Sequence, residues 1–169
     1  MKILFVCTGN ICRSPLAQAV FEKLVLERGL ADHYQVESAG TTAYHVGDDA
    51  DSRMRRTAAE HGVPFNHHSN QISRRDLDAY DLIAVMDRDN LAAVLRLAGS
   101  RDAAGKTRLF REFDPQGHPD AQVPDPYYGG PDGFEEVFRI VERTGRALLD
   151  RLESERTGVA RSVNQPQEL

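Results

Sequence analysis

Near its N-terminus the chain reads Phe5-Val6-Cys7-Thr8-Gly9-Asn10-Ile11-Cys12-Arg13-Ser14-Pro15. The apolar run at 3–6 predicts a buried β-strand, and an apolar pattern with helical spacing begins just after this stretch. Residues 7–13 must therefore form a tight turn that leads from the strand into the helix. In a parallel sheet such a turn lies at the C-terminal edge of the strands, where ligands bind.

Two side chains of this turn, Cys7 and Arg13, are separated by five residues. Because helix N-termini and successive backbone N–H groups carry partial positive charge, the turn predicts a cradle for a tetrahedral dianion such as phosphate. The same positive charge favours a thiolate, so we expect Cys7 to be a nucleophile at neutral pH. The planar fork of Arg13 suits the rim, because it can donate two parallel hydrogen bonds to phosphate.

The neighbouring residues also suit such a turn. Ser14 can cap the helix or donate to the cysteine sulfur, and Pro15 fits the first helical position, where no N–H is needed. Gly9 and Asn10 tolerate a positive φ, which a turn folded back over its own sulfur requires. The alternative is a buried cysteine followed by a surface arginine, since this spacing also arises by chance. The preceding strand and the Ser-Pro pair favour the phosphate cradle.

Length and composition limit the class of protein. The chain has 169 residues, 40% hydrophobic and 28% charged, with a net charge of −5. This length suits one domain with a full core, and the acidic balance disfavours nucleic acid and anionic membranes as partners. No apolar run approaches the roughly 20 residues of a membrane span, and a polar turn stands where a signal peptide needs an apolar stretch. We expect a cytoplasmic protein, although secretion without a signal peptide stays open.

Neither metal nor cofactor is expected. The two cysteines both lie in the turn, so they cannot build a disulfide framework or a four-cysteine zinc site. The run Asp87-Arg88-Asp89-Asn90 superficially suggests a calcium loop. However, Leu91 falls where a ligand is needed and Ala92 where the turn glycine is needed, so we reject this metal site.

Strands and helices alternate along the rest of the chain. Apolar or alternating runs predict further strands at 34–38, 81–86 and 107–110. Helical spacing predicts helices at 14–29, around 54–59, at 73–77, at 91–97 and at 132–152. This alternation implies a parallel sheet with helices on both faces. From about residue 154 the composition turns polar and predicts a frayed tail.

A second group of functional candidates lies at 123–130, in the loop Val-Pro-Asp-Pro-Tyr-Tyr-Gly-Gly. Because a residue before proline is biased to an extended conformation, the carboxyl of Asp125 can be held out from the chain toward an active site. An ordinary turn with aromatic side chains is the alternative. The cysteine turn earlier in the chain disfavours it.

Three stretches, 7–15, 38–41 and 125–129, together resemble the low-molecular-weight protein tyrosine phosphatases over roughly residues 2–153. The resemblance implies one α/β domain at 1–153, followed by a polar, flexible tail at 154–169. The expected fold is a three-layer sandwich of flavodoxin-like or Rossmann-like type, with a four-stranded parallel sheet in the order 2-1-3-4. The implied activity is hydrolysis of phosphotyrosine, an aryl phosphate monoester, through a phosphocysteine intermediate. The implied partner is a tyrosine-phosphorylated protein, and we expect a monomer.

The resemblance also assigns roles to residues. It makes Cys7 the nucleophile and Asp125 the general acid, while Arg13 and the loop bind the phosphoryl group. The loop residues are Thr8, Gly9, Asn10, Ile11, Cys12 and Ser14. Ser38 and His67 match positions that brace the loop through Asn10. The pocket wall is expected to consist of Ile11, Tyr44, Tyr127 and Tyr128. Two positions depart from the family pattern: Tyr44 replaces a frequent Trp, and Asn70 replaces the usual Arg.

Three rival functions remain open at this point. A branch of the family that acts on phosphoarginine carries Thr where this chain has Ile11, and the bulky Ile11 favours phosphotyrosine. An arsenate reductase of the same fold needs further cysteines, and none follows Cys12. A non-catalytic phosphate-binding or phosphocysteine carrier module would have no use for Asp125. We also advance the hypothesis that Cys12 forms a reversible disulfide with Cys7 after oxidation, whereas a small packing residue is the alternative.

Overall fold

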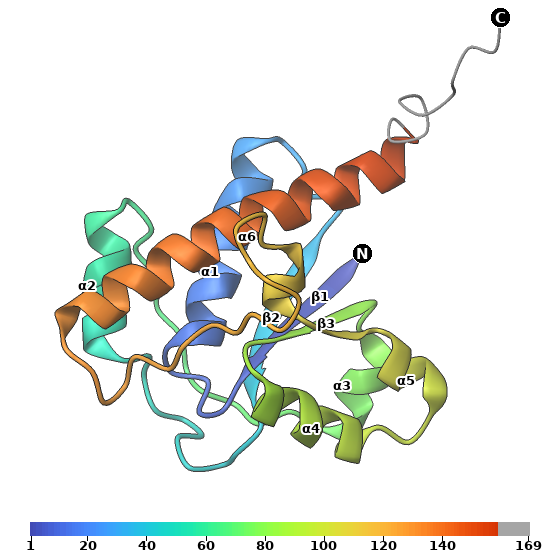
Figure 1. Cartoon of the computed structure of the whole chain (residues 1–169), viewed down its shortest axis with the longest axis horizontal. Helices are drawn as coiled ribbons and strands as arrows, with labels where there is room; N and C mark the ends of the chain where they lie inside the picture. The colour runs from blue at the N-terminus through green and yellow to red at the C-terminus, as the bar shows by residue number, and fades with distance from the viewer. Residues whose placement is uncertain (159–169) are drawn as a thin grey trace, which may run out of the picture.

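The first strand, β1 (Lys2–Cys7), lies inside a parallel sheet of four strands whose order is β2-β1-β3-β4 (Figure 1). The computed structural model describes residues 1–158. The other strands are β2 (Gln35–Gly40), β3 (Leu82–Val85) and β4 (Thr107–Leu109), and all neighbouring strands run parallel. The predicted order 2-1-3-4 is confirmed.

Helices cover both faces of the sheet (Figure 1). One face carries α1 (Arg13–Glu27) and α6 (Pro131–Thr157), with α2 (Ser52–Glu60) against α6. The other face carries α3 (Arg74–Ala79), α4 (Arg88–Leu97) and α5 (Arg101–Gly105). Because β1 has β2 on one side and β3 on the other, the C-terminal end of β1 lies at the point where the strand order reverses. Ligands bind at such switch points in open α/β sheets.

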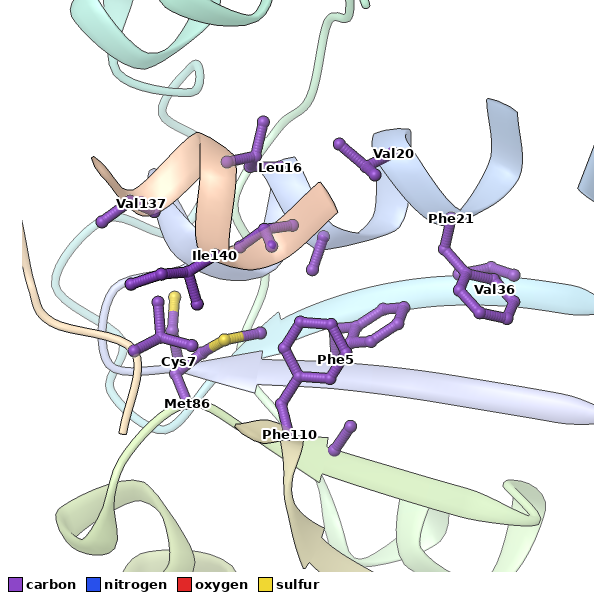
Figure 2. Packing of buried hydrophobic residues seen from close by; sticks show 14 of the residues in the cluster. Phe5, Cys7, Leu16, Val20, Phe21, Val36, Met86, Phe110, Val137 and Ile140 are labelled. Atoms are coloured by element: carbon purple, nitrogen blue, oxygen red, sulfur yellow. The ribbon is translucent and has the colours of Figure 1, made fainter. Parts of the chain in front are cut away.

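The strand β1 is buried on both faces, which explains its unbroken apolar sequence. Ile3 and Phe5 point into the core beneath α1 and α6, while Leu4 and Val6 belong to the core on the other face. Figure 2 shows Phe5 between two other rings, with centroid distances of 5.8 Å to Phe21 and 5.2 Å to Phe110. Cys7 lies at the end of the same strand, so this packing fixes where its sulfur emerges.

Several boundaries differ from the sequence-based expectation. The predicted fourth strand includes Phe110, but β4 ends at Leu109 and Phe110 begins a 3-10 turn, Phe110–Phe113, because its ring packs edge-on against Phe5. The short helix α5 is not predicted from the sequence. The helix α6 continues to Thr157 and so includes the first four residues of the predicted tail, just after Glu153, which accepts hydrogen bonds from Tyr34 and Arg156. The remainder of that tail, 159–169, lies outside the described residues.

Within residues 1–158, no helix combines the length and the apolar character that crossing a membrane requires.

Candidate active site

A cavity of about 580 Å³ opens at the C-terminal end of β1. Its floor is the turn between β1 and α1, and its walls come from two distant loops, one after β2 and one before α6. The cavity therefore brings together ten of the residues singled out from the sequence: Cys7, Thr8, Gly9, Ile11, Cys12, Arg13, Tyr44, Asp125, Tyr127 and Tyr128. The other four, Asn10, Ser14, Ser38 and His67, do not line it.

The turn folds back over the Cys7 sulfur. The backbone N–H of Asn10 donates to Cys7 Sγ at 3.3 Å, and Ser14 Oγ lies 3.0 Å from the same sulfur. Asn10 has a positive φ of 55°, as expected, whereas Gly9 does not. Gly9 is needed for space instead, because a Cβ there would meet the ring of His45 at 2.9 Å. The sulfur thus accepts a backbone hydrogen bond from its own loop and contacts a hydroxyl from the first turn of α1.

The start of α1 differs in detail from the expectation. The helix begins at Arg13, so Pro15 is its third residue rather than its first, although no N–H is needed there either. Cys12 is the N-cap and no side chain caps the helix. Ser14 is therefore available to contact the sulfur. Of the two roles predicted for Ser14, the structure realises the contact with sulfur.

Backbone donors without internal partners surround this sulfur. Within the described part of the chain, no protein acceptor meets the N–H groups of Gly9, Ile11, Cys12, Arg13 and Ser14. Four of these residues line the cavity, and Arg13 and Ser14 form the first turn of α1. Free N–H groups at a helix N-terminus bind anions, so the turn has the donors that a phosphate group requires.

Arg13 is the cation of the site and is 2% exposed. Its Nη1 donates to Asp87 Oδ2 at 2.7 Å and to the carbonyl of Val123 at 3.0 Å. Burial alone lowers the pKa of Arg13, but the negative charges of Cys7, Asp87 and Asp125 outweigh burial and leave the pKa raised. The guanidinium is therefore always charged, and Asp87 and Val123 set its orientation.

Asp125 lies at the mouth of the cavity with half of its side chain exposed. Its Oδ2 is 3.5 Å from Arg13 Nη2, and its Oδ1 accepts the backbone N–H of Tyr127 at 3.1 Å. The loop brings this carboxyl to the cysteine turn although 118 positions separate the two in the sequence. A carboxyl at the mouth can exchange a proton with a group bound between it and the sulfur.

Asn10 holds the loop from behind and is fully buried. Its amide nitrogen donates to Ser14 Oγ at 2.8 Å and to Ser38 Oγ at 3.0 Å. Its oxygen lies 2.7 Å from His67 Nε2 and accepts the backbone N–H of Asn70 at 2.9 Å. The bracing contacts expected of Ser38 and His67 are therefore present, and Asn70 takes part in them in place of the usual Arg.

His67 reaches Asn10 as a donor. Burial lowers the pKa of His67, and the neighbouring His68 adds to this effect, so the ring is neutral at pH 7. Since Asn10 Oδ1 is an acceptor, the proton of the neutral ring lies on Nε2. At the end of β2, Gly40 lets this strand approach the turn that follows β1, because a Cβ at position 40 would meet the carbonyl oxygen of Thr8 at 2.8 Å.

The two cysteines differ in their surroundings. Burial raises the pKa of Cys12, and the negative charges of Asp51 and Cys7 raise it further. Cys12 is therefore a neutral thiol and not a competing nucleophile. Both cysteines are free, and the disulfide hypothesis stays a prediction.

The walls of the cavity are aromatic. Tyr44 and Tyr128 are 88% and 94% exposed at the rim, while Tyr127 is half-buried and Ile11 is buried at the floor. Two residues that the sequence did not single out, Thr42 and His45, complete the lining.

Sequence reasoning also missed the role of Asp87 and Asn90. Asp87 caps α4 by accepting the backbone N–H of Asn90, besides pairing with Arg13. The side-chain amide of Asn90 lies 3.0 Å from Thr8 Oγ1. The available signal was position, because Asp87 follows the predicted strand 81–86, whose C-terminal end lies beside that of β1.

Residues 2–158 match the family model described as low molecular weight phosphotyrosine protein phosphatase. A low molecular weight protein-tyrosine-phosphatase of Streptomyces coelicolor is 44% identical over 149 residues, which cover 88% of this chain and 91% of that protein. The low molecular weight phosphotyrosine protein phosphatase of Homo sapiens is 38% identical over 151 residues, covering 89% and 94%. A crystal structure of a protein tyrosine phosphatase from Entamoeba histolytica superposes with a TM-score of 0.87 at 38% identity, covering 92% and 99%. The chain therefore belongs to the low molecular weight phosphotyrosine protein phosphatases, a family of hydrolases.

Proposed function

We propose that this protein hydrolyses phosphotyrosine in proteins, with Cys7 as nucleophile and Asp125 as general acid. The thiolate attacks phosphorus, so that an S–P bond forms while the bond from phosphorus to the phenolic oxygen breaks. Asp125, in its protonated form, gives its proton to the leaving phenolate. As a carboxylate it then takes a proton from the water that attacks the phosphocysteine, the S–P bond breaks, and phosphate leaves.

The observation that carries this proposal is the convergence on one sulfur of unpartnered N–H groups and a buried guanidinium. Phosphoryl transfer places negative charge on three equatorial oxygens, and fixed donors stabilise that charge without reorganisation. The N–H groups of the turn and Arg13 supply these donors, while the contact with Asp87 keeps the guanidinium in place. Inorganic phosphate, the product, has the same shape and is expected to inhibit competitively.

The cavity walls support an aryl substrate. A phenyl ring bound above the sulfur can pack against Tyr44 and Tyr127, and the bulky Ile11 at the floor suits a flat ring. The position of Asp125 at the mouth favours hydrolysis over a phosphocysteine carrier, because a carrier does not need to protonate a phenolate. The two rim tyrosines, Tyr44 and Tyr128, are exposed and can contact the protein around a phosphotyrosine.

The test is to trap the intermediate. With p-nitrophenyl phosphate as substrate, quenching of the Asp125→Ala variant should give a protein whose mass is increased by one phosphoryl group, located on Cys7 by peptide mapping. Cys7→Ser should hydrolyse neither this substrate nor a phosphotyrosine peptide, and Cys12→Ser serves as the matched control. Hydrolysis by Cys7→Ser at the rate of the unchanged protein would refute the proposal. Equal rates on phosphoarginine and phosphotyrosine would refute the aryl preference.

A further inference from the structure

The loop that carries Asp125 has few attachments beyond its first residue. Val123 is fixed firmly, because its N–H donates to the carbonyl of Met86 and its own carbonyl accepts from Arg13. Within residues 1–158, no backbone hydrogen bond joins 124–129 to another element. The bonds that do occur there, such as Tyr127 N–H to Asp125, are internal to the loop. The position of the Asp125 carboxyl therefore depends on side chains.

Three side chains tie this part of the loop to the protein: Asp125 through its contact with Arg13, the buried Pro126, and the half-buried ring of Tyr127. Of these, Tyr127 is the one that reaches α2. Arg53, at the start of α2, lies over it with its Cζ 5.4 Å from the ring centroid. Tyr128 also touches the ring but is 94% exposed, so it cannot hold the loop in place. His45 is further away, with a centroid distance of 6.3 Å. Figure 1 shows this loop running toward α2 before it enters α6.

Arg53 is itself held on two sides. Its Cζ lies 4.7 Å from the ring centroid of Phe134, a buried residue in the first turn of α6. Its Nε and Nη2 donate to the two carboxylate oxygens of Asp51 at 3.1 and 2.8 Å. A planar guanidinium can form this fork and cover aromatic faces at the same time, whereas an ammonium group cannot.

Asp51 connects this arrangement to the cysteine turn. Its backbone N–H donates to the carbonyl of Ile11 at 2.8 Å, and its carboxylate caps α2 through the N–H groups of Arg53 and Met54. A continuous series of contacts thus runs from the turn through Asp51 and Arg53 to Tyr127, which is two residues from the general acid. The acid loop and the phosphate cradle are held to the same short segment.

We propose that Arg53 is a positioning residue that holds Tyr127, and through it the carboxyl of Asp125, over the cysteine turn. This inference rests on the proposed role of Asp125 as general acid. Arg53 does not touch the phosphate group, because its guanidinium is directed to Asp51 and to the two rings. Its loss is therefore expected to impair proton transfer to the leaving group and to leave oxyanion binding intact.

The experiment compares Arg53→Ala and Arg53→Lys with Arg56→Ala, an exposed arginine on the same helix, as the matched control. We measure kcat and KM for phenyl phosphate, a poor leaving group, and for p-nitrophenyl phosphate, a good one. Arg53→Ala should lose about tenfold more kcat on the poor leaving group than on the good one, the size expected for one well-placed contact of this kind. Arg53→Lys should lose activity in the same direction, because it keeps the charge without the fork.

Two further measurements separate positioning from a general loss of structure. Vanadate inhibition should stay within about twofold in both Arg53 variants, since the turn and Arg13 are unchanged, and thermal unfolding shows whether each variant is folded at the assay temperature. In an Asp125→Asn background, Arg53→Ala should cause no further change in the ratio between the two substrates, because its effect passes through Asp125.

The outcomes distinguish the two proposals. The role of Arg53 is overturned, and that of Asp125 is not, if the ratio of kcat between the two substrates is the same in Arg53→Ala and Arg53→Lys as in Arg56→Ala. The same conclusion follows if Arg53→Ala changes this ratio as much in the Asp125→Asn background as in the unchanged protein. If Asp125→Asn by itself loses equally on both substrates, the general acid is wrongly assigned and both proposals fail.

Discussion

The contact between Asp87 and Arg13 yields the sharpest test of how this site is held. Asp87→Asn removes the negative charge 2.7 Å from Arg13 Nη1 while keeping an oxygen that can still accept the backbone N–H at the start of α4. Two unit charges about 4 Å apart attract by roughly 4 kcal/mol at an effective dielectric constant of 20. Part of this attraction is screened, since the Asp87 side chain is 20% exposed while that of Arg13 is 2% exposed.

We expect Asp87→Asn to lower the free energy of unfolding by about 2–3 kcal/mol, because a buried guanidinium loses its partner. For a chain of this size the melting temperature should fall by about 5–10 °C. The guanidinium also loses one of the two contacts that orient it, and kcat/KM for p-nitrophenyl phosphate should fall by roughly 10- to 100-fold. Inhibition by inorganic phosphate should not weaken, since a negative charge has been removed beside an anion site.

Asp89→Asn is the matched control, because it makes the same charge change at an exposed position in the first turn of the same helix. Asp87→Ala should be less stable than Asp87→Asn by about 1 kcal/mol, since it also loses the helix cap. Steady-state kinetics and urea unfolding at pH 7 measure both effects. If kcat/KM of Asp87→Asn lies within about twofold of that of Asp89→Asn, Asp87 does not position Arg13 and the reasoning is refuted.

Three further predictions concern stability and oxidation. Burial lowers the pKa of His67 from 6.5, so the folded protein favours the neutral ring and becomes less stable as the pH falls below about 6.5. Between pH 7.5 and 5.5 the melting temperature of His67→Gln should therefore fall less than that of the exposed control His68→Gln. Asp114 is buried, which alone raises its pKa, but hydrogen bonds from two arginines and a backbone N–H lower the pKa from 3.8 to about 2. Asp114→Asn should therefore destabilise the protein by roughly 2 kcal/mol at pH 7, and urea unfolding should show the difference shrinking as the pH falls from about 4 to 2. If Cys12 traps oxidised Cys7 as a disulfide, peroxide inactivation should be reversed by dithiothreitol less completely in Cys12→Ser than in the unchanged protein, and equal recovery of activity would contradict the hypothesis.

Local sequence patterns determined most of the fold. The apolar runs at 3–6 and 82–85 are strands because both faces of a central parallel strand are buried, and this requirement leaves a pattern that can be read directly. The boundaries that were missed depend on distant partners. Phe110 leaves the strand because Phe5 offers its ring an edge-on contact, and α6 extends to Thr157 where Tyr34 and Arg156 bind Glu153.

The sequence by itself also determined the chemistry of the turn, because Cys7, Arg13 and the residues between them lie within one strand-to-helix connection and their geometry is local. Only the tertiary structure decided what orients these groups. Asp87 follows β3, Asn70 lies between α2 and α3, and Arg53 lies in the first turn of α2. Position after a predicted strand was the one local signal for Asp87, and the residues around Arg53 gave none. These three residues reach the site because parallel strands end at one edge of the sheet, so that the loops after β1, β2 and β3 and the loop before α6 meet there.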